Sequence, residues 1–590
     1  MQGLSGLLRY SQQGRRQFLR GIALRTLAQL FTVLPFFIAW LALGDLQWGG
    51  GGWSQWSWLA AGLGICLLAQ LVFSHFGQLD CFLGSYALMS QYRQALAEHL
   101  RRLPLGWFQR HRVGSTSALL TDQVKRVEEI FSHMLPEVVL GLVTPLLFAM
   151  LLMLVDPWLT LALFATVIPG ALLLWLMTHF LLRGACEQGQ RFAIASGLLV
   201  EFVSGIKTLR LFNRHQQMLV RLDETFADIR RASMGMEAWG GGGVLLFRLL
   251  AESGLVVMFI TAAALWQQDA LPPATWLLFV LVGYKVISPL LDAAAWFTLL
   301  RVMRQSAAKL DALMAEPTQP EEGNGSTTQG NSVRFEKVSF AYDSQPVVSD
   351  ISFTAPEGSV TALVGPSGSG KSTLLHLLGG FWSPQQGEIS LGGVALAKLG
   401  ARELHQRMGY VMQDVQLFDG SVLDNVRIGN PQANDEQIIE ACRQAWCQEF
   451  IERLPQGYHT RLGEGAQRLS GGERQRLSIA RMMLKDPAII ILDEATALLD
   501  PLSQAQVQMA LSKLARGKTV LMIAHRLRTV EFASQILVLE NGRIVERGTH
   551  THLLAKGGLY ARLWQAQEQE RTLSEGKRDQ LNVGFADAHH

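Results

Sequence analysis

Long apolar segments dominate the N-terminal half of the chain. Six of them contain the roughly 20 largely apolar residues that are needed to span the hydrocarbon core of a bilayer. They lie at about 21–43, 57–89, 135–155, 157–182, 244–266 and 274–300. The third and fourth are joined only by VDPW, which predicts a tight hairpin. The pattern therefore predicts six membrane-spanning helices.

Two connections between these segments are long and basic. Residues 90–134 contain seven Lys and Arg residues and residues 183–239 contain eight, whereas the connections at 44–56 and 267–273 contain none. Because Lys and Arg concentrate in cytoplasmic connections, we expect both long connections, both termini and the C-terminal half to face the cytoplasm. Their helix-favouring sequence predicts helices that continue well beyond the bilayer.

The pattern changes after the sixth apolar segment, where alternating strand and helix patterns of ordinary soluble composition begin. The intervening EPTQPEEGNGSTTQG is rich in Pro, Gly, Ser, Thr and Glu, which cannot bury a core, and it predicts a flexible tether. We divide the chain into a six-span membrane α-helical domain (1–315), a linker (316–332), an α/β phosphate-loop nucleotide-binding domain (333–568) and a polar tail that we expect to be disordered (569–590).

Composition narrows the function. The chain has 590 residues, of which 49% are hydrophobic and 17% charged, which lies between a soluble enzyme and an integral membrane protein. Its net charge of +3 is too small to suggest a nucleic-acid partner. The five cysteines have no metal or disulfide spacing and are interpreted as free thiols in a reducing compartment.

The stretch ALVGPSGSGKSTLLHLL, residues 362–378, combines an apolar strand, a glycine-rich turn and a helix start. It fits the phosphate-loop pattern, in which backbone N–H groups and the helix N-terminus surround phosphates. Lys371 is expected to reach the β- and γ-phosphates of ATP, and the Ser372 hydroxyl to ligate Mg²⁺. The predicted nucleotide-binding residues of this loop are Gly365, Ser367, Gly368, Gly370, Lys371, Ser372 and Thr373.

A second buried strand, AIIILDEAT at 488–496, ends in two carboxylates. Asp493 is placed to hold the Mg²⁺ shell, and Glu494 to polarise the attacking water, because hydrolysis needs an acceptor near the γ-phosphate. The alternative for either carboxylate alone is an acidic helix cap. Their occurrence together with a phosphate loop favours catalysis.

The stretch LSGGERQRLSIAR, residues 469–481, resembles the signature sequence of ATP-binding cassette transporters. Other motifs of the family occur in order. The resemblance implies that Tyr342 in FAY stacks on adenine, that Gln413 in VMQD contacts Mg²⁺ and that His525 in IAHR contacts the γ-phosphate. ALLD, ending at Asp500, stands where the family usually has SALD. The six spans with two long extensions resemble the exporter-type fold of the same family. The resemblance implies that the chain lies in a bacterial inner membrane.

The resemblance also implies a partner subunit. In this family Ser470, Gly471 and Gly472 complete the ATP site of the opposite cassette, so a chain with one cassette is half a transporter. We expect it to dimerise with itself or with a homologous subunit, and we favour a heterodimer. The expected cofactors are ATP and Mg²⁺.

Details of sequence favour one substrate class. LVTPLL at 142–147, Glu473 in the signature and EFIERLPQGYHTRLGE at 449–464 resemble a group of exporter-fold transporters that import iron–siderophore complexes, such as the yersiniabactin importer. We therefore favour import of a yersiniabactin-like ferric siderophore. The alternative is export of a lipid, peptide or drug. A cassette ATPase without transport activity is excluded by the six spans.

Polar residues inside the apolar segments are candidates for the substrate path, because charges at membrane depth are rare and usually functional. The candidates are His75, Asp80, Arg248, Glu252, Lys285 and Asp292. Arg248 and Glu252 are four residues apart and share one helix face. Two interpretations stay open for this pair: a structural ion pair between helices, or a lining that meets an anionic iron chelate.

Four consecutive glycines, Gly240 to Gly243, stand where the fifth span begins. Each glycine inside a helix costs about 1 kcal/mol relative to alanine. A run of four predicts either a soft joint, at which the span bends, or close helix–helix packing by small residues. The sequence leaves both open.

Overall fold

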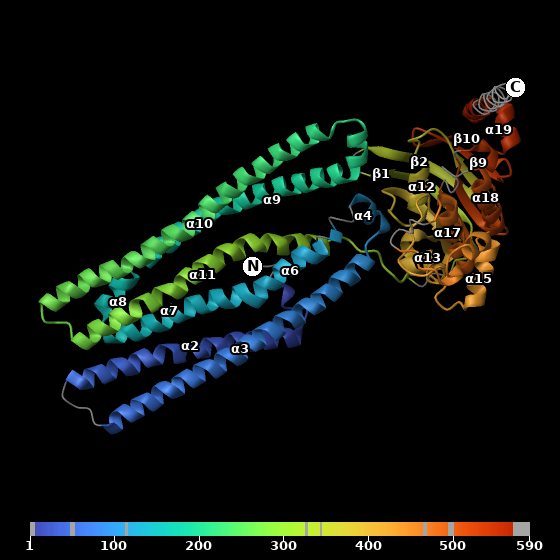
Figure 1. Ribbon diagram of the computed structural model, residues 1–590. Coiled ribbons are helices and arrows are strands. Elements are labelled where there is room, and N and C mark those ends of the chain that lie inside the picture. Colours follow the sequence, from blue (N-terminus) through green and yellow to red (C-terminus); the bar gives the residue numbers. More distant parts are fainter. Residues whose placement is uncertain are drawn as a thin grey trace, which may run out of the picture. The chain divides into compact units, whose positions relative to one another are not determined.

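The computed structural model describes residues 6–47, 53–111, 116–117, 119–324, 328–342, 345–463, 469–493, 501–524 and 526–569. The chain forms two compact units (Figure 1). The helical unit comprises residues 1–101 and 113–316, and the α/β unit comprises residues 102–112 and 317–590. A short segment between the second and third spans thus belongs with the α/β unit, which the division by sequence did not anticipate.

Among the described residues, the helical unit contains six helical segments that are long and apolar enough to cross a membrane, as predicted. Helix α2 packs along α3, α7 packs against α2 and α11, and α10 packs against α8 and α9. The elements are α2 (Gln12–Gln47), α3 (Trp53–Arg101), π-turn η1 (Leu119–Gln123), α6 (Val124–Glu129), π-turn η2 (Ile130–Met134), α7 (Leu135–Val155), α8 (Pro157–Phe164), α9 (Val167–Leu211), α10 (His215–Gln267) and α11 (Pro273–Met314).

Prolines and caps explain the interruptions between these helices. Pro136 follows η2, and Pro169 follows the short break between α8 and α9. Proline has no N–H to donate and its ring clashes with the carbonyl four residues earlier, which disturbs the preceding turn. The predicted VDPW hairpin is present. The Asp156 side chain caps α8 by accepting a hydrogen bond from the Leu159 N–H at 3.0 Å.

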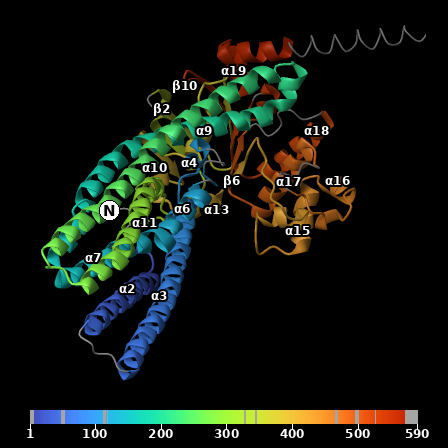
Figure 2. The same ribbon diagram turned by 60° about the vertical axis from the view of Figure 1, so that its left-hand side comes forward.

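The predicted helical extensions are also present. Helix α3 continues to Arg101, well past the end of the apolar segment near residue 89. Helices α9 and α10 run side by side in both views and are joined by a short turn at residues 212–214 (Figures 1 and 2). Their apolar portions continue without interruption into this two-helix extension.

Small residues bring α2 and α3 into close contact. A Cβ atom added at Gly21 would lie 2.5 Å from the Cys81 backbone nitrogen, and one at Gly84 would lie 2.5 Å from the Phe18 backbone nitrogen. No larger side chain fits at either position, so the two helices approach to backbone contact.

The four glycines of α10 divide into two pairs. The helix is continuous from His215 to Gln267 and includes all four glycines. A Cβ at Gly240 would lie 2.9 Å from Leu181 Cδ1, and one at Gly243 would lie 3.2 Å from Met177 Cβ. Gly241 would meet only Glu237 of the preceding turn, at 3.7 Å, and Gly242 would meet no atom within 4 Å. Close packing explains Gly240 and Gly243, and it leaves Gly241 and Gly242 unexplained.

In the described part of the α/β unit, a four-stranded antiparallel sheet has the order β2-β1-β4-β5 and a six-stranded sheet the order β10-β9-β3-β8-β7-β6. Its strands are β1 (Val333–Ala341), β2 (Pro346–Ala355), β3 (Val360–Val364), β4 (Gln386–Leu391), β5 (Val394–Ala395), β6 (Met408–Val411), β7 (Ile489–Asp493), β8 (Thr519–Ile523), β9 (Gln535–Glu540) and β10 (Arg543–Gly548).

Buried side chains of the strands and of the helices around them form the cores of this unit. Its helices and short 3₁₀ turns are α4 (Leu105–Arg110), α12 (Lys371–Leu378), η3 (Leu396–Lys398), α13 (Ala401–Arg407), α14 (Val422–Arg427), α15 (Asp435–Gln444), α16 (Gln448–Glu452), η4 (Gly457–His459), α17 (Gly471–Lys485), α18 (Pro501–Ala515), η6 (Leu527–Val530) and α19 (His550–Lys556).

The described part of the polar segment before β1 is hydrogen-bonded to this unit. The Gln319 N–H donates to the Arg102 carbonyl at 2.7 Å, and the Ala401 N–H donates to the Pro320 carbonyl at 3.0 Å. The Gln329 N–H donates to the Gly392 carbonyl at 2.9 Å. Composition predicts a tether without a hydrophobic core. The contacts of this segment are backbone hydrogen bonds, which do not require buried apolar side chains.

Candidate nucleotide site

Four parallel strands bring most of the predicted nucleotide residues to one edge of the six-stranded sheet. In the order β3-β8-β7-β6 each strand pairs in parallel with the next. Parallel strands end at the same edge, where open α/β sheets bind their ligands. The phosphate loop follows β3, Asp493 ends β7 and Gln413 lies two residues beyond β6. The predicted site is therefore assembled along this edge.

The phosphate loop requires glycine at three places. Gly365, Gly368 and Gly370 have positive φ angles of 148°, 78° and 97°, which residues with a Cβ rarely adopt. A Cβ at Gly365 would also lie 2.1 Å from the Leu539 carbonyl oxygen. These residues let the backbone turn sharply between β3 and α12.

Lys371 is buried at the start of α12, with 5% of its surface exposed. Its ammonium donates to the carbonyl oxygens of Gly365 and Pro366, at 2.9 and 2.7 Å. The lysine charge is thereby held over the loop that precedes it. Ser372 and Ser367 are exposed, and Thr373 is buried.

Tyr342 lies beside the phosphate-loop helix. Its hydroxyl is 3.3 Å from the Thr373 hydroxyl oxygen, and its ring meets Phe340 and Trp382 edge to face at centroid distances of 5.1 and 5.9 Å. The structure thus brings together Tyr342 and the loop residues, which are 23 positions apart or more in sequence.

Asp493 accepts a hydrogen bond from the Tyr410 hydroxyl at 3.4 Å. Burial, with Asp493 as a second cause, raises the pKa of Tyr410 well above its usual range, so this phenol remains a donor at neutral pH. Burial also lowers the pKa of His376 on α12, against the opposing effect of Asp493. A carboxylate, a hydroxyl and exposed Gln413 on one edge are ligand types that Mg²⁺ prefers.

The signature residues begin helix α17. Ser470 is its N-cap and accepts from the Glu473 N–H at 3.2 Å, while the Glu473 carboxylate accepts from the Ser470 N–H at 2.8 Å. This is a capping box, a role that glutamine fills equally well. Glu473 is thus explained by helix capping and does not by itself indicate a substrate class.

Three predicted residues, Glu494, Asp500 and His525, lie outside the described residues. Asp493 precedes Glu494 directly, and β8 ends two residues before His525. Their roles remain predictions.

Comparison with known proteins covers both units. The family model described as ABC transporter matches residues 348–497, and that of the ABC transporter transmembrane region matches residues 33–282. The ATP-dependent lipid A-core flippase of Chromobacterium violaceum is 34% identical over 489 residues, which are 82% of this chain and 83% of the flippase. The chain belongs to the ABC transporter family. The residues that match the ABC transporter model lie in the α/β unit.

Two further relatives refine this assignment. The mycobactin import ATP-binding/permease protein of Mycobacterium tuberculosis is 37% identical over 505 residues. The match covers 82% of this chain and 57% of that protein, so the chain spans little more than half the length of this relative. A solved bacterial Atm1-family ABC exporter with ATP bound has a TM-score of 0.80 at 25% identity and covers 94% of this chain and 98% of its own. The predicted exporter-type fold is confirmed.

Two residues within the signature stretch have roles in this ABC transporter that sequence reasoning did not single out. Arg481 is buried and donates to the Asn425 and Gln416 carbonyl oxygens, each at 2.6 Å. Burial lowers its pKa to about 10. Gln475 donates to the Met412 carbonyl at 3.3 Å. Both connect α17 to the segment around Gln413. Their position inside the signature stretch was the one feature of the sequence that could have indicated these roles.

The predicted substrate-path residues do not form one cluster. Arg20 pairs with Asp80 at 3.1 Å, and Arg248 pairs with Glu252 at 2.8 Å, with Arg248 half exposed. The i,i+4 pair is thus present. His75 is exposed and meets Phe76 edge to face.

Lys285 and Asp292 differ from these pairs. Both are exposed, and seven residues separate them, so they share one face of α11. Neither makes a hydrogen bond or an ion pair with another residue in the part of the chain that the structure describes. Lys285 is thus an exposed cation in an apolar helix.

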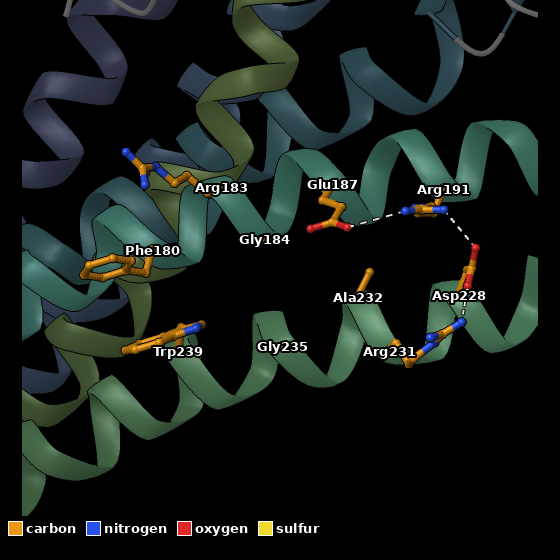
Figure 3. A pocket seen from close by; sticks show the side chains of 10 residues that line it. All are labelled: Phe180, Arg183, Gly184, Glu187, Arg191, Asp228, Arg231, Ala232, Gly235 and Trp239. Atoms are coloured by element: carbon orange, nitrogen blue, oxygen red, sulfur yellow. Dashed lines mark hydrogen bonds and ion pairs between the residues drawn. The ribbon is translucent and has the colours of Figure 1, made fainter.

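A pocket of about 420 Å³ lies between α9 and α10 (Figure 3). Arg191 joins Asp228 of the facing helix at 2.8 Å and Glu187 of its own at 3.7 Å. At the other end the rings of Phe180 and Trp239 stack at 4.9 Å. The two helices are therefore held together at both ends of the pocket. The lining residues are Phe180, Arg183, Gly184, Glu187, Arg191, Asp228, Arg231, Ala232, Gly235 and Trp239.

Proposed function

We propose that the chain is one half of a dimeric transporter that imports a ferric siderophore across the inner membrane of a bacterium, powered by hydrolysis of Mg²⁺–ATP. The proposal has three parts: the roles of the nucleotide residues, the partner subunit, and the substrate with its direction. Each part is supported by different residues.

In the nucleotide site, Lys371 and the loop N–H groups hold the phosphates, and Tyr342 stacks on adenine. Ser372, Asp493 and Gln413 ligate Mg²⁺, which supplies charge neutralisation at the phosphates. Glu494 orients the attacking water and His525 contacts the γ-phosphate. The parallel sheet edge supports this assignment because it gathers the loop, Asp493 and Gln413 within one region.

The partner contributes the second half of each ATP site. Ser470 and Gly471 are exposed at the start of α17. The Gly471 and Gly472 N–H groups donate to no other residue in the described part of the chain. The first N–H groups of a helix have no partner within it and favour anions. We propose that these groups meet the γ-phosphate bound by a second half-transporter, with a heterodimer favoured and the membrane lipids around it.

The observation that carries siderophore import is the 37% identity to a mycobactin import protein across 82% of this chain. Lys285 is consistent with it. A partly anionic iron chelate is attracted to an exposed cation at membrane depth, where charges are costly unless they serve a function. Arg248 fits this role less well because it already has an ion-pair partner, and Asp80 is an anion that pairs with Arg20.

Deletion of the gene in its own organism tests the substrate. We expect uptake of ⁵⁵Fe-loaded siderophore to fall at least tenfold and to return on complementation with the wild-type chain, but not with Glu494→Gln. Uptake of ferric citrate in the same strain is the control. Unchanged siderophore uptake in the deletion strain contradicts import.

The alternative is lipid export, supported by the 34% identity to a lipid A-core flippase over most of both chains. Under this alternative the deletion strain accumulates its lipid on the cytoplasmic leaflet and takes up siderophore normally. Labelling of outward-facing lipid in the same strain distinguishes the two functions.

A further inference from the structure

Helix α4 is a short segment between the second and third spans that belongs to the α/β unit. It follows α3 after three residues, and it contacts Phe381 and Trp382, which follow helix α12. The Gly106 N–H donates to the Phe381 carbonyl at 3.0 Å. A Cβ at Gly106 would lie 2.1 Å from Trp382 Cε2, so only glycine lets the α4 backbone lie against the Trp382 ring.

Arg110, at the end of α4, contacts two aromatic residues of the α/β unit. Its guanidinium carbon lies 4.7 Å from the centroid of the Trp382 ring. One of its terminal nitrogens also donates to the main-chain carbonyl of Tyr342. A guanidinium can stack on a ring and donate in its own plane at the same time, which an ammonium cannot do.

The two aromatic residues contact each other. The rings of Tyr342 and Trp382 meet edge to face at 5.9 Å, and both pack against Phe340. The residues after Tyr342, positions 343 and 344, lie outside the described residues. Arg110 therefore fixes the backbone of Tyr342 directly and its ring through Trp382.

We propose that Arg110 is a positioning residue for the nucleobase: it holds Tyr342 in the orientation that stacks on adenine, so the base site is complete only when α4 is seated on Trp382. The proposal rests on the proposed role of Tyr342. Displacement of α4 from Trp382 then weakens base binding, and base binding in turn stabilises α4 on Trp382, because such coupling is reciprocal.

The test compares a nucleotide with its phosphate portion alone. In the full-length chain in lipid nanodiscs, we expect Arg110→Ala to raise the dissociation constant of ADP about 5- to 20-fold, the range of one well-placed cation–π contact and hydrogen bond. The dissociation constant of inorganic pyrophosphate, which has no base, should change less than twofold. The KM for ATP should rise with kcat nearly unchanged.

Three variants control for folding. Arg110→Lys keeps a donor and loses the planar stack, so it should restore part of the ADP affinity. Gly106→Ala should reproduce the Arg110→Ala result, because its added Cβ displaces α4 from Trp382. Arg453→Ala removes another surface arginine, whose partners are on Glu449, and should leave both dissociation constants unchanged.

Separate results would overturn the inference and the role of Tyr342. An equal rise for ADP and pyrophosphate in Arg110→Ala would show that Arg110 supports the phosphate loop, which contradicts the inference. If Tyr342→Ala weakens ADP and Arg110→Ala does not, the inference fails and the role of Tyr342 stands. If Tyr342→Ala has no effect, the role of Tyr342 fails. When Arg110→Ala and Tyr342→Ala are combined, we expect the affinity for ADP to be no lower than in Tyr342→Ala alone.

Discussion

The two units of this ABC transporter place their polar residues by different means. In the α/β unit, Asp493, Gln413 and the phosphate loop are all attached to the ends of parallel strands whose order is fixed by backbone pairing. In the helical unit, Asp80, Arg248 and Lys285 stand on three different helices, and each has a different environment.

The difference follows from geometry. A strand end and a glycine-rich turn each permit one narrow arrangement, so a motif of a few residues specifies a position in space. A helix projects side chains in all directions around its axis, and packing against other helices decides which of them are paired, buried or exposed. A polar residue in a span is therefore much weaker evidence for a site than a motif at a sheet edge.

We expect the largest effect from a change in the chemistry at the sheet edge. Glu494→Gln should lower ATP turnover at least 100-fold, because the amide cannot accept a proton from the attacking water. The dissociation constant of ATP should change less than threefold, because the fold and the phosphate loop are retained. Phosphate release and nucleotide binding by the same purified variant check both expectations. Undiminished turnover would show that another residue is the base.

Substitution of Arg481, the buried arginine of helix α17, tests how much this helix stabilises the segment around Gln413 at the sheet edge. Arg481→Met should destabilise the α/β unit by about 3 kcal/mol, because it leaves the buried Asn425 carbonyl oxygen without its charged donor and also removes the donor to the Gln416 carbonyl. The melting temperature of the variant measures the loss. Arg474→Met, on the same helix and less buried, is the matched control. Equal melting temperatures for the two variants would contradict this role.

The paired glycines of α10 test the helical unit. Gly241→Ala with Gly242→Ala should stabilise the helix by about 1–2 kcal/mol, because neither added methyl meets another helix. If the four glycines serve only packing, the Gly241→Ala and Gly242→Ala double variant leaves transport unchanged. The Gly240→Ala and Gly243→Ala double variant then impairs transport, because the added methyl groups clash with Leu181 and Met177. Slower transport by the first pair, with normal ATP binding, would instead establish a joint. Substrate uptake by both double variants decides.

The smallest expected effect concerns pH. Burial lowers the pKa of His376 and of His405 below the usual value near 6.5. As the pH falls below that value, the two histidines become protonated in the unfolded chain before they do so in the folded unit. The free energy of unfolding should therefore fall as the pH decreases from 7 to 5.5. His376→Gln with His405→Gln should show a flatter dependence of melting temperature on pH. An unchanged dependence would show that other groups control it.

The six spans, their long helical extensions and the strand–loop–helix of the phosphate loop follow from the sequence alone. They depend on local signals: apolar length, and glycines in the turn between a strand and a helix. Such features are set by residues close in the chain, so they can be predicted without knowledge of the rest of the fold.

The contacts between residues far apart in the chain follow from the packing of the folded units. This packing pairs Asp80 with Arg20, places Arg481 on Asn425, and seats α4 against Trp382 beside Tyr342. These contacts join residues far apart in sequence, and packing of whole elements fixes them. A local pattern cannot specify them, because the same side chain on the same helix has a different partner when the helix is rotated by one residue.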